Sequence, residues 1–417
     1  MKYAPWMPSG EFRAATRATY IAFIGSGFAF ASWASRIPQV RDRLELSPSQ
    51  LGLVLLAVAA GSLLSMPLSG PAVSRFGSRL TVTVTSVLMS VALLVVAIGY
   101  QVGVLPILIG LFLLGVANGS WDVAMNVQGA RVERLLERAI MPRFHAGFSI
   151  GTVAGALLGA AMVALDVSVT VHLVGVAVVL VAAVPLGVRP FVPDEAIDVG
   201  SDRSPGDLEA ARSGGSRTLQ AWREPRTLLV GLIVLAFAFA EGVGNDWIAV
   251  ALIDGYQLPP AIGTLGFALF LTAMTAGRWF GPALLDRYGR VVVLRLLSLL
   301  SVAGLALFIF GQVPALAFAG AVLWGAGVSL GFPVGMSAGA DEPEMAAARV
   351  SVIASIGYVA FLGGPPLIGF LGDQITVLKA LTAVGVLLAL AALITDNVRP
   401  PKAPGTERLE ADQRVTP

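Results

Sequence analysis

The chain has 417 residues, of which 56% are hydrophobic and only 13% are charged, and its formal net charge is +2. Soluble domains carry about 25% charged residues, so an ordinary soluble enzyme of this length is excluded. The small net charge gives no indication of a nucleic-acid partner. Because the sequence contains no cysteine, disulfides, iron–sulfur clusters and thiol catalysis are excluded as well.

Apolar segments with few charges recur twelve times along the chain. A helix needs about 20 apolar residues to cross a bilayer, whereas a membrane β-strand needs only about 10 residues of alternating polarity. The sequence therefore predicts an all-α membrane protein with twelve transmembrane helices. Their expected cores are Thr19–Ile37, Leu51–Pro71, Leu80–Gly99, Val104–Met125, His145–Leu165, Val169–Val188, Leu228–Val250, Ile262–Leu285, Val291–Phe310, Pro314–Ala338, Val350–Leu371 and Ile375–Ile394.

Most basic residues lie on one side of the predicted membrane. With the N-terminus inside, the outer segments hold only Arg36, Arg41, Arg43 and Lys379. The positive-inside rule then places both termini in the cytoplasm. The basic residues of the inner segments include Lys2, Arg13, Arg17, Arg75, Arg79, Arg131, Arg134, Arg138, Arg143, Arg287, Arg290, Arg295, Arg349, Arg399, Lys402, Arg408 and Arg414.

Two polar stretches interrupt the apolar pattern and are expected to be disordered: Pro190–Arg226 and the residues after Arg399. The first lies at the middle of the chain and is expected to link two six-helix halves. We therefore predict an N-terminal bundle at 1–189, a cytoplasmic linker at 190–226, a C-terminal bundle at 227–398 and a disordered tail at 399–417.

The two predicted bundles share short sequence matches, in the same order and at an offset near 209. A duplicated six-helix unit, with pseudo-symmetric halves that meet around a central site, is an architecture of secondary transporters. The matches include Phe28–Ala31 with Phe237–Ala240, Gly70–Gly77 with Pro282–Gly289, and Ser149–Gly151 with Ser355–Gly357.

The loop Pro282–Arg290 resembles the signature loop of the major facilitator superfamily. The first copy of this loop departs from the pattern, because Ser74 stands where an aspartate is expected. The resemblance extends over nearly the whole chain and implies a transporter, not an enzyme, in a bacterial inner membrane. The signature residues in the second copy are Asp286, Arg287, Gly289 and Arg290.

Three further segments resemble the bacterial YbjJ-type branch of that superfamily, which is related to the fucose-permease-like group. They are Trp33–Pro38, Trp121–Gly129 and Phe144–Gly147. This narrower resemblance does not identify a substrate.

Polar side chains in the first half mark a possible site on the fourth predicted helix. Asp122 has Asn118 and Asn126 four residues to either side, so the three share one helical face. A carboxylate in the membrane costs at least about 2.5 kcal/mol and normally faces a cavity or a partner, although hydrogen bonds between helices are the alternative. His145 begins the next helix at a similar depth and either shares a proton with Asp122 or lies at the membrane surface. His172 lies a few residues into the sixth predicted helix, on the outer side, and is expected at the membrane interface.

The seventh predicted helix carries a second polar group. Glu241 and Asn245 share a face, and Asp246 lies nearer the outer surface. Glu241 is the carboxyl we expect to load and release a proton, followed by Asp122 and then His145. Substrate contacts are expected from Trp33, Asn118, Asp122, Asn126, Glu241, Asn245 and Phe332.

Charged residues near both membrane surfaces are expected to act as gates. Arg36 ends the first helix at the depth of Asp246. One interpretation is that it pairs with Asp246 or Glu241 and closes the outer side. The alternative is that it reaches the lipid headgroups. At the inner side, Asp286 can accept from helix N-terminal amides. The resemblance implies that the loop residues hold the two halves together at the inner side when the site opens outward. The contact is expected to be weaker in the first loop, because Ser74 cannot supply the charge of an aspartate. The inner gating residues are Arg75, Asp286, Arg287 and Arg290.

Two clusters of glycine and proline, Gly331–Pro333 and Gly363–Pro366, are expected to interrupt their helices. The sequence contains no motif for ATP or for a metal of the His/Cys type, so we expect no cofactor. The partners expected are a small solute, protons and the bilayer, with the chain acting as a monomer. A proton-coupled permease for a sugar-like polar solute competes with an exporter of amphipathic compounds; a membrane-embedded sensor is a remote alternative.

Overall fold

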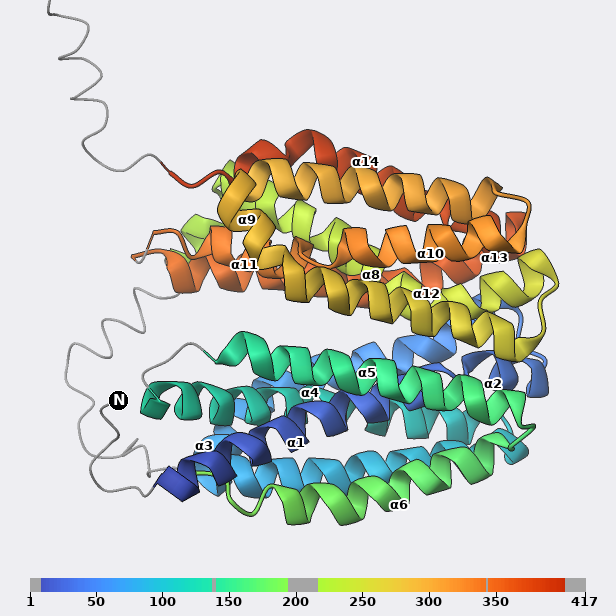
Figure 1. The fold of residues 1–417 in the computed structure, drawn as a ribbon, viewed down its shortest axis with the longest axis horizontal. Coiled ribbons are helices and arrows are strands. Elements are labelled where there is room, and N and C mark those ends of the chain that lie inside the picture. Colours follow the sequence, from blue (N-terminus) through green and yellow to red (C-terminus); the bar gives the residue numbers. More distant parts are fainter. Residues whose placement is uncertain (1–8, 137–139, 194–216, 343, 402–417) are drawn as a thin grey trace, which may run out of the picture.

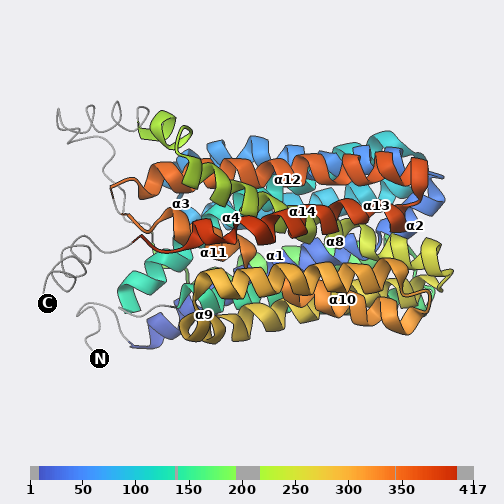
Figure 2. The ribbon, with the colours of Figure 1, turned by 90° about the horizontal axis from the view of Figure 1, so that it is seen from above.

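Helices make up nearly all of the computed structural model, which describes residues 9–136, 140–193, 217–342 and 344–401. The predicted linker and tail therefore lie largely outside the described residues, as do Lys2, Arg138, Lys402, Arg408 and Arg414. In Figure 1 the helices form two bundles, one from each half of the chain. The start of α1 and the end of α14 lie at the same end of the molecule in both Figure 1 and Figure 2.

The helix bounds follow the predicted segments closely. The first bundle contains α1 (Ser9–Ala34), α2 (Ile37–Arg43), α3 (Pro48–Val102), α4 (Val104–Leu136), α5 (Met141–Ala164) and α6 (Val169–Gly187). The second contains α8 (Pro225–Tyr256), α9 (Pro260–Phe310), α10 (Pro314–Val328), α11 (Gly331–Gly339), α12 (Ala346–Ile375), α13 (Val377–Ala380), α14 (Thr382–Ile394) and the 3₁₀ helix η1 (Thr395–Val398).

Two of these helices are long enough to cross a bilayer twice. At about 1.5 Å per residue, α3 with 55 residues and α9 with 51 residues each exceed twice the roughly 30 Å of a hydrocarbon core. Each turns at a glycine with positive φ: Gly77 (φ 81°, ψ 156°) and Gly289 (φ 76°, ψ 163°). These glycines end the matching loops of the internal repeat, so the repeat is visible in the backbone as well as in the sequence.

The predicted twelve crossings are confirmed. Nine described helices are long and apolar enough to span a membrane, and α3 and α9 each count twice. The 26-residue α1 supplies the remaining crossing. The interruption expected at Gly331–Pro333 lies directly before these residues, since the tenth crossing is divided at Ser329 and Leu330 between α10 and α11.

The expected interruption at Gly363–Pro366 is wrong. Helix α12 runs without a break from Ala346 to Ile375, with Pro365 and Pro366 inside it. Proline is tolerated within membrane helices because neighbouring groups satisfy the carbonyls that it leaves free. The start of α8 at Pro225 also lies slightly inside the stretch predicted as linker.

Small residues bring neighbouring helices of one half into backbone contact. A Cβ atom placed on Gly27 of α1 would lie 2.2 Å from the carbonyl oxygen of Phe148 in α5. The reverse also holds, because a Cβ on Gly151 of α5 would lie 2.2 Å from the carbonyl oxygen of Ile24. Such close approach is typical of membrane helices that associate through small residues. It makes α1 and α5 one packed unit.

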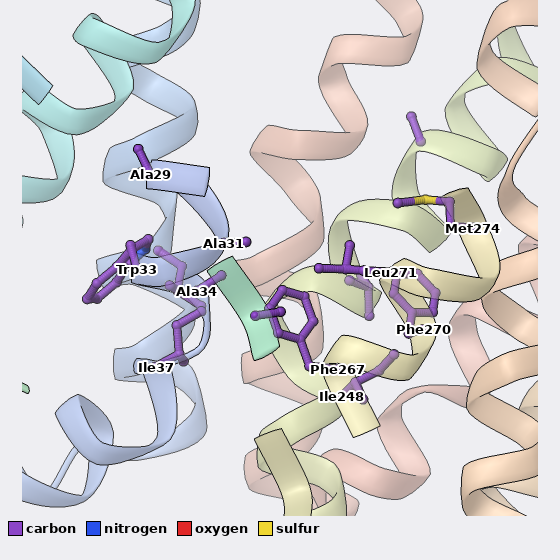
Figure 3. Packing of buried hydrophobic residues seen from close by; sticks show 14 of the residues in the cluster. Ala29, Ala31, Trp33, Ala34, Ile37, Ile248, Phe267, Phe270, Leu271 and Met274 are labelled. Carbon is purple, nitrogen blue, oxygen red and sulfur yellow. The ribbon is translucent and has the colours of Figure 1, made fainter. Parts of the chain in front are cut away.

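The two halves touch closely at the end of the molecule opposite the start of α1. There the beginning of α3 packs on the end of α12: a Cβ on Gly52 would lie 2.4 Å from the Pro365 carbonyl oxygen, and one on Gly369 would lie 2.4 Å from that of Pro48. One cluster of buried apolar residues also runs through both halves. Figure 3 shows part of it, from Ile37 beside α1 to Ile248 on α8 and Phe267 on α9.

Candidate functional site

Polar side chains from both halves come close to one another where the two bundles meet. They form two groups, which together we call the central polar cluster: Asp122 and Asn126 on α4 with Tyr358 on α12, and His145 on α5 with Glu241 on α8 and Arg278 on α9. Such groups are costly within a membrane and are usually retained for a substrate or ion pathway.

An ion pair lies at the midpoint of α8. Nη2 of Arg278 donates to both carboxylate oxygens of Glu241, at 2.8 Å each. Nε of the same side chain donates to the carbonyl oxygen of Ser329 at 3.3 Å. Ser329 lies at the break between α10 and α11, where the carbonyl lacks a normal helical partner. One guanidinium therefore links three helices of the second half.

Arg278 was not among the residues expected from the sequence. It is the single charged residue within the predicted segment Ile262–Leu285, and that isolation is the signal that could have identified it. The Glu241 and Arg278 side chains are 20% and 27% exposed. Because Glu241 lies deep along its helix, this exposure indicates an open space beside the pair.

The carboxylate of Asp122 has a different environment. The side-chain amide of Asn126 donates to the Asp122 carboxylate at 3.2 Å and to its carbonyl oxygen at 2.9 Å, as their four-residue spacing predicts. Across the boundary between the halves, Tyr358 of α12 lies close enough to interact electrostatically with this carboxylate. Asn118, one turn earlier, is half-buried. Among the contacts of the described residues, no cation compensates Asp122.

His145 faces the same boundary from α5. Its ring is exposed and meets the edge of Phe23 with 5.2 Å between ring centroids. The guanidinium of Arg278, from the other half, lies close enough to interact with it electrostatically. The partner that we expected, Asp122, is hydrogen bonded to Asn126 instead.

The other polar residues of α8 lie one turn beyond Glu241. Asn245 and Asp246 are both half-buried. The amide oxygen of Asn245 is buried and accepts no hydrogen bond from the described residues, so it is an available acceptor beside the ion pair. On α12, Phe361 packs against Gly242, and Phe332 of α11 packs against Gly357. Aromatic rings thus border the polar groups.

Polar contacts also join the halves at the end opposite the start of α1. The guanidinium of Arg41 on α2 binds both carboxylate oxygens of Asp254 on α8, with 2.9 Å between Nη2 and Oδ1. Close by, the backbone amide of Ser49 and the hydroxyl of Ser47 donate to Asp373 of α12, at 3.3 and 3.5 Å. We call these the outer contacts. The polar bonds that join described residues of the two halves lie at this end.

At the other end, ion pairs remain within the second half. The carboxylate of Asp341 accepts from Arg226 at 2.8 Å and from Arg290 at 2.6 Å. Nearby, Arg349 donates to Glu224 at 2.6 Å, and this hydrogen bond lowers the pKa of Glu224. These pairs connect the beginnings of α8 and α12 to the turn of α9 and to the end of α11.

A family model described as Major Facilitator Superfamily matches residues 19–365. The match covers most of both bundles. The chain belongs to the major facilitator superfamily. It is therefore a secondary transporter rather than an enzyme, and its expected partner is a small-molecule substrate.

Relatives within the superfamily match over nearly the full length. The chain is 31% identical over 383 residues to the uncharacterized transporter y4wD of Sinorhizobium fredii, covering 91% of this chain and 96% of that protein. It is 29% identical to an uncharacterized MFS-type transporter of Yersinia pestis, covering 90% and 93% of the two chains. It is also 29% identical to the membrane protein MosC of Rhizobium meliloti, covering 90% and 89%.

Solved structures show the same fold. The crystal structure of the nucleoside transporter NupG has a TM-score of 0.71 and covers 92% of this chain and 98% of that chain. A mutant of NupG gives a TM-score of 0.76. Sequence identity is 12% in both cases, so this likeness concerns the fold alone.

Two residues expected in the site or gate of this MFS transporter have other roles. Trp33 is 2% exposed, and Figure 3 shows its ring on the side of α1 away from Phe267 of α9, so it packs in the first half. Arg36 is 2% exposed; its Nε donates to Nδ1 of His172 at 2.9 Å and its Nη2 to the carbonyl oxygen of Val167 at 2.9 Å. The expected pairs of Arg36 with Asp246 or Glu241 are therefore absent. His172 lies near the start of α6 and is buried against Arg36.

The expected inner gating residues do not join the halves in this conformation. Arg290 pairs within the second half, while Arg75 and Arg287 are exposed and lie over the neighbouring rings of Phe76 and Tyr288. Asp286 is exposed.

Proposed function

We propose that this transporter moves a small polar solute through the boundary between its two halves by alternating access, coupled to protons. Its termini lie in the cytoplasm of a bacterium, and the protein resides in the inner membrane. The observation that carries the proposal is the central polar cluster, in which polar groups of the two halves lie close to one another across their boundary. The positive-inside distribution of basic residues supports the orientation.

The outer contacts support an inward-facing conformation. They hold the halves together at the end away from the termini, while the ion pairs near the termini connect only elements of the second half. In this conformation the loop residues Arg75, Arg287 and Arg290 form no bond with a described residue of the opposite half. Their latch would form when the outer contacts break, as the resemblance to the superfamily implies.

We assign the transported proton to Asp122. The charge of Glu241 is compensated by Arg278, whereas Asp122 has an amide and a tyrosine as neighbours. Tyr358 belongs to the opposite half, so the protonation state of Asp122 acts on the boundary that opens and closes. His145, beside Arg278, is the next group along the same boundary.

The solute site that we propose contains hydrogen-bonding groups of both signs. Glu241 and Asn245 offer acceptors, Arg278 and Asn126 offer donors, and aromatic rings border them. Such a lining suits a sugar-like solute, in keeping with the resemblance to the YbjJ-type branch, and NupG makes nucleosides a reasonable addition to the test. An exporter of amphipathic compounds, which prefers a wide apolar cavity, remains the alternative.

The test uses proteoliposomes that contain the pH indicator pyranine. Sugars, polyols, amino acids, nucleosides and amphipathic cations are added singly, and solute-driven proton movement is recorded. We expect a polar solute to drive protons across the membrane. Asp122→Asn should abolish that proton movement but retain exchange of labelled solute at equal concentrations. Asp166→Asn is the matched control, because the same chemical change is made in an exposed loop.

The outcomes separate the alternatives. Proton movement that persists in Asp122→Asn would contradict the assignment of the proton to Asp122. Movement driven only by amphipathic cations would support the exporter. Solute entry that is unaffected by an imposed pH gradient would contradict proton coupling.

A further inference from the structure

We propose that a crevice between α3 and α6, at the end of the molecule that holds the start of α1 and the end of α14, binds the phosphate headgroup of an anionic phospholipid. The crevice has a volume of about 400 Å³. Its lining residues are Phe76, Arg79, Leu80 and Thr83 from α3, and Pro185 and Arg189 from α6 and its end. The proposal depends on the chain being in a bilayer and not on which solute it transports.

The two arginines of the crevice are uncompensated. Arg79 and Arg189 are both exposed, and neither side chain forms a hydrogen bond or ion pair with another described residue. The lining contains no acidic residue. Two guanidinium groups around one small space attract an anion, and the planar guanidinium fork matches a phosphate particularly well.

The second half has a carboxylate between two arginines at the place that corresponds to this crevice. The sequence Val188–Pro190 repeats as Val398–Pro400, so Arg189 corresponds to Arg399. In the second half, the carboxylate of Asp396 accepts from Arg399 at 3.0 Å and from Arg295 of α9 at 2.7 Å.

At the same offset as this repeat, the residue of the first half that corresponds to Asp396 is Leu186. Counted from the glycines at the two helix turns, Arg295 corresponds to Thr83, one helical turn after Arg79. The first half thus has two arginines near this place, Arg79 and Arg189, but no carboxylate between them. A bound phosphate would supply the missing negative charge.

The surroundings favour a lipid over a soluble phosphate. Phe76 and Leu80 are 57% and 49% exposed, and Leu186 beside them is 55% exposed. Large apolar side chains at the rim of a basic crevice suit an acyl chain next to a headgroup. Basic pockets between transmembrane helices near the cytoplasmic surface are known to bind anionic headgroups.

The test measures lipid retention by the full-length protein. Purified protein is delipidated in mild detergent and titrated with phosphatidylglycerol or phosphatidylcholine, and bound lipid is counted by native mass spectrometry. We expect a preference for phosphatidylglycerol. The double variant Arg79→Gln/Arg189→Gln should weaken phosphatidylglycerol binding about tenfold or more, because two charge-assisted hydrogen-bonding groups are lost.

Two further variants make the result specific. Leu186→Asp places a carboxylate where the second half has Asp396, and it should weaken lipid binding while both arginines remain. Arg13→Gln/Arg17→Gln removes the same charge from exposed positions of α1 and should change binding less than about twofold. A circular-dichroism melt of each variant shows whether it remains folded.

Three results would overturn the proposal. The first is equal binding of phosphatidylglycerol and phosphatidylcholine. The second is a loss in the α1 control as large as that in the crevice variant. The third is displacement of the lipid by millimolar inorganic phosphate, which would indicate a site for a soluble anion. Failure of solute transport in proteoliposomes leaves each of these readouts intact, so the two proposals are tested separately.

Discussion

Removing the Arg41–Asp254 ion pair should shift the transporter away from its outward-closed conformation. The pair joins α2 of the first half to α8 of the second half, with 2.9 Å between Nη2 and Oδ1. If the outer contacts hold the halves together, Asp254→Asn weakens only the closed arrangement. The open arrangement, in which the two residues are apart, is unaffected.

The expected size of the shift follows from the exposure of the pair. The Arg41 side chain is 11% exposed, but that of Asp254 is 45% exposed, so solvent screens the interaction. Ion pairs of this kind contribute about 0.5–1 kcal/mol. Since about 1.4 kcal/mol changes an equilibrium constant tenfold, the ratio of open to closed molecules should rise about two- to fivefold.

The absence of cysteine makes this measurement direct. Leu105→Cys and Ala315→Cys place two spin labels on exposed positions at the outer end, one on each half. Distance distributions from pulsed electron paramagnetic resonance in lipid nanodiscs then report the two conformations. Asp254→Asn should increase the population with the longer distance.

Asp42→Asn is the matched control. Asp42 also binds Arg41, with 2.8 Å between Nε and Oδ1, but it belongs to the same half. Its loss should not favour the open conformation. An unchanged distribution in Asp254→Asn, or an equal shift in Asp42→Asn, would refute the role of the ion pair in closing the outer side.

Two further predictions concern stability. Gly27→Ala places a methyl group 2.2 Å from the Phe148 carbonyl oxygen, so it should cost about 1–3 kcal/mol of folding stability and lower the thermal midpoint. Gly10→Ala lies on the same helix in open space and should leave the thermal midpoint unchanged. Equal effects of the two substitutions would contradict the packing argument. Because Arg349 lowers the pKa of Glu224, their bond stabilises the fold fully above about pH 4.3 and is lost as pH falls through the lowered value. Glu224→Gln should therefore reduce the difference in thermal midpoint between pH 7 and pH 3, and an unchanged difference would contradict this.

Hydropathy and the internal repeat were sufficient to predict twelve crossings in two halves. Hydropathy depends on the solvent around each segment, and the repeat depends on the order of residues. Both can be read from a single sequence. The behaviour of Pro365 and Pro366 could not be predicted in the same way. Whether proline breaks a membrane helix depends on the neighbours available to its free carbonyls, and those come from helices distant in the sequence.

The candidate site was predictable only in part. The sequence marked Asp122, Asn126, His145 and Glu241, but it marked neither Arg278 nor Tyr358 and none of the pairs between helices. The sequence shows that Glu241 is a costly charge within a membrane, yet its partner Arg278 follows 37 residues later on another helix. The choice of Arg278 over Arg36 depends on how α8 packs on α9. Likewise, tryptophan near a helix end suits a membrane interface or a core equally, and only the packing of α1 assigns Trp33 to the core.

The division of the tenth crossing gives the centre of the molecule a mechanical connection to its cytoplasmic end. Arg278 holds the carbonyl of Ser329 at one end of α11, and Asp341 follows the other end, bound to Arg226 and Arg290. Helix α11 has only nine residues, and so short a helix would move as one rigid unit. A solute that draws Arg278 toward itself would pull on the first end of α11. Helix α11 would then shift the ion pairs of Asp341, which lie at the inner end of the second half. Occupancy at the centre would in this way be transmitted to the inner gate through a single helical segment.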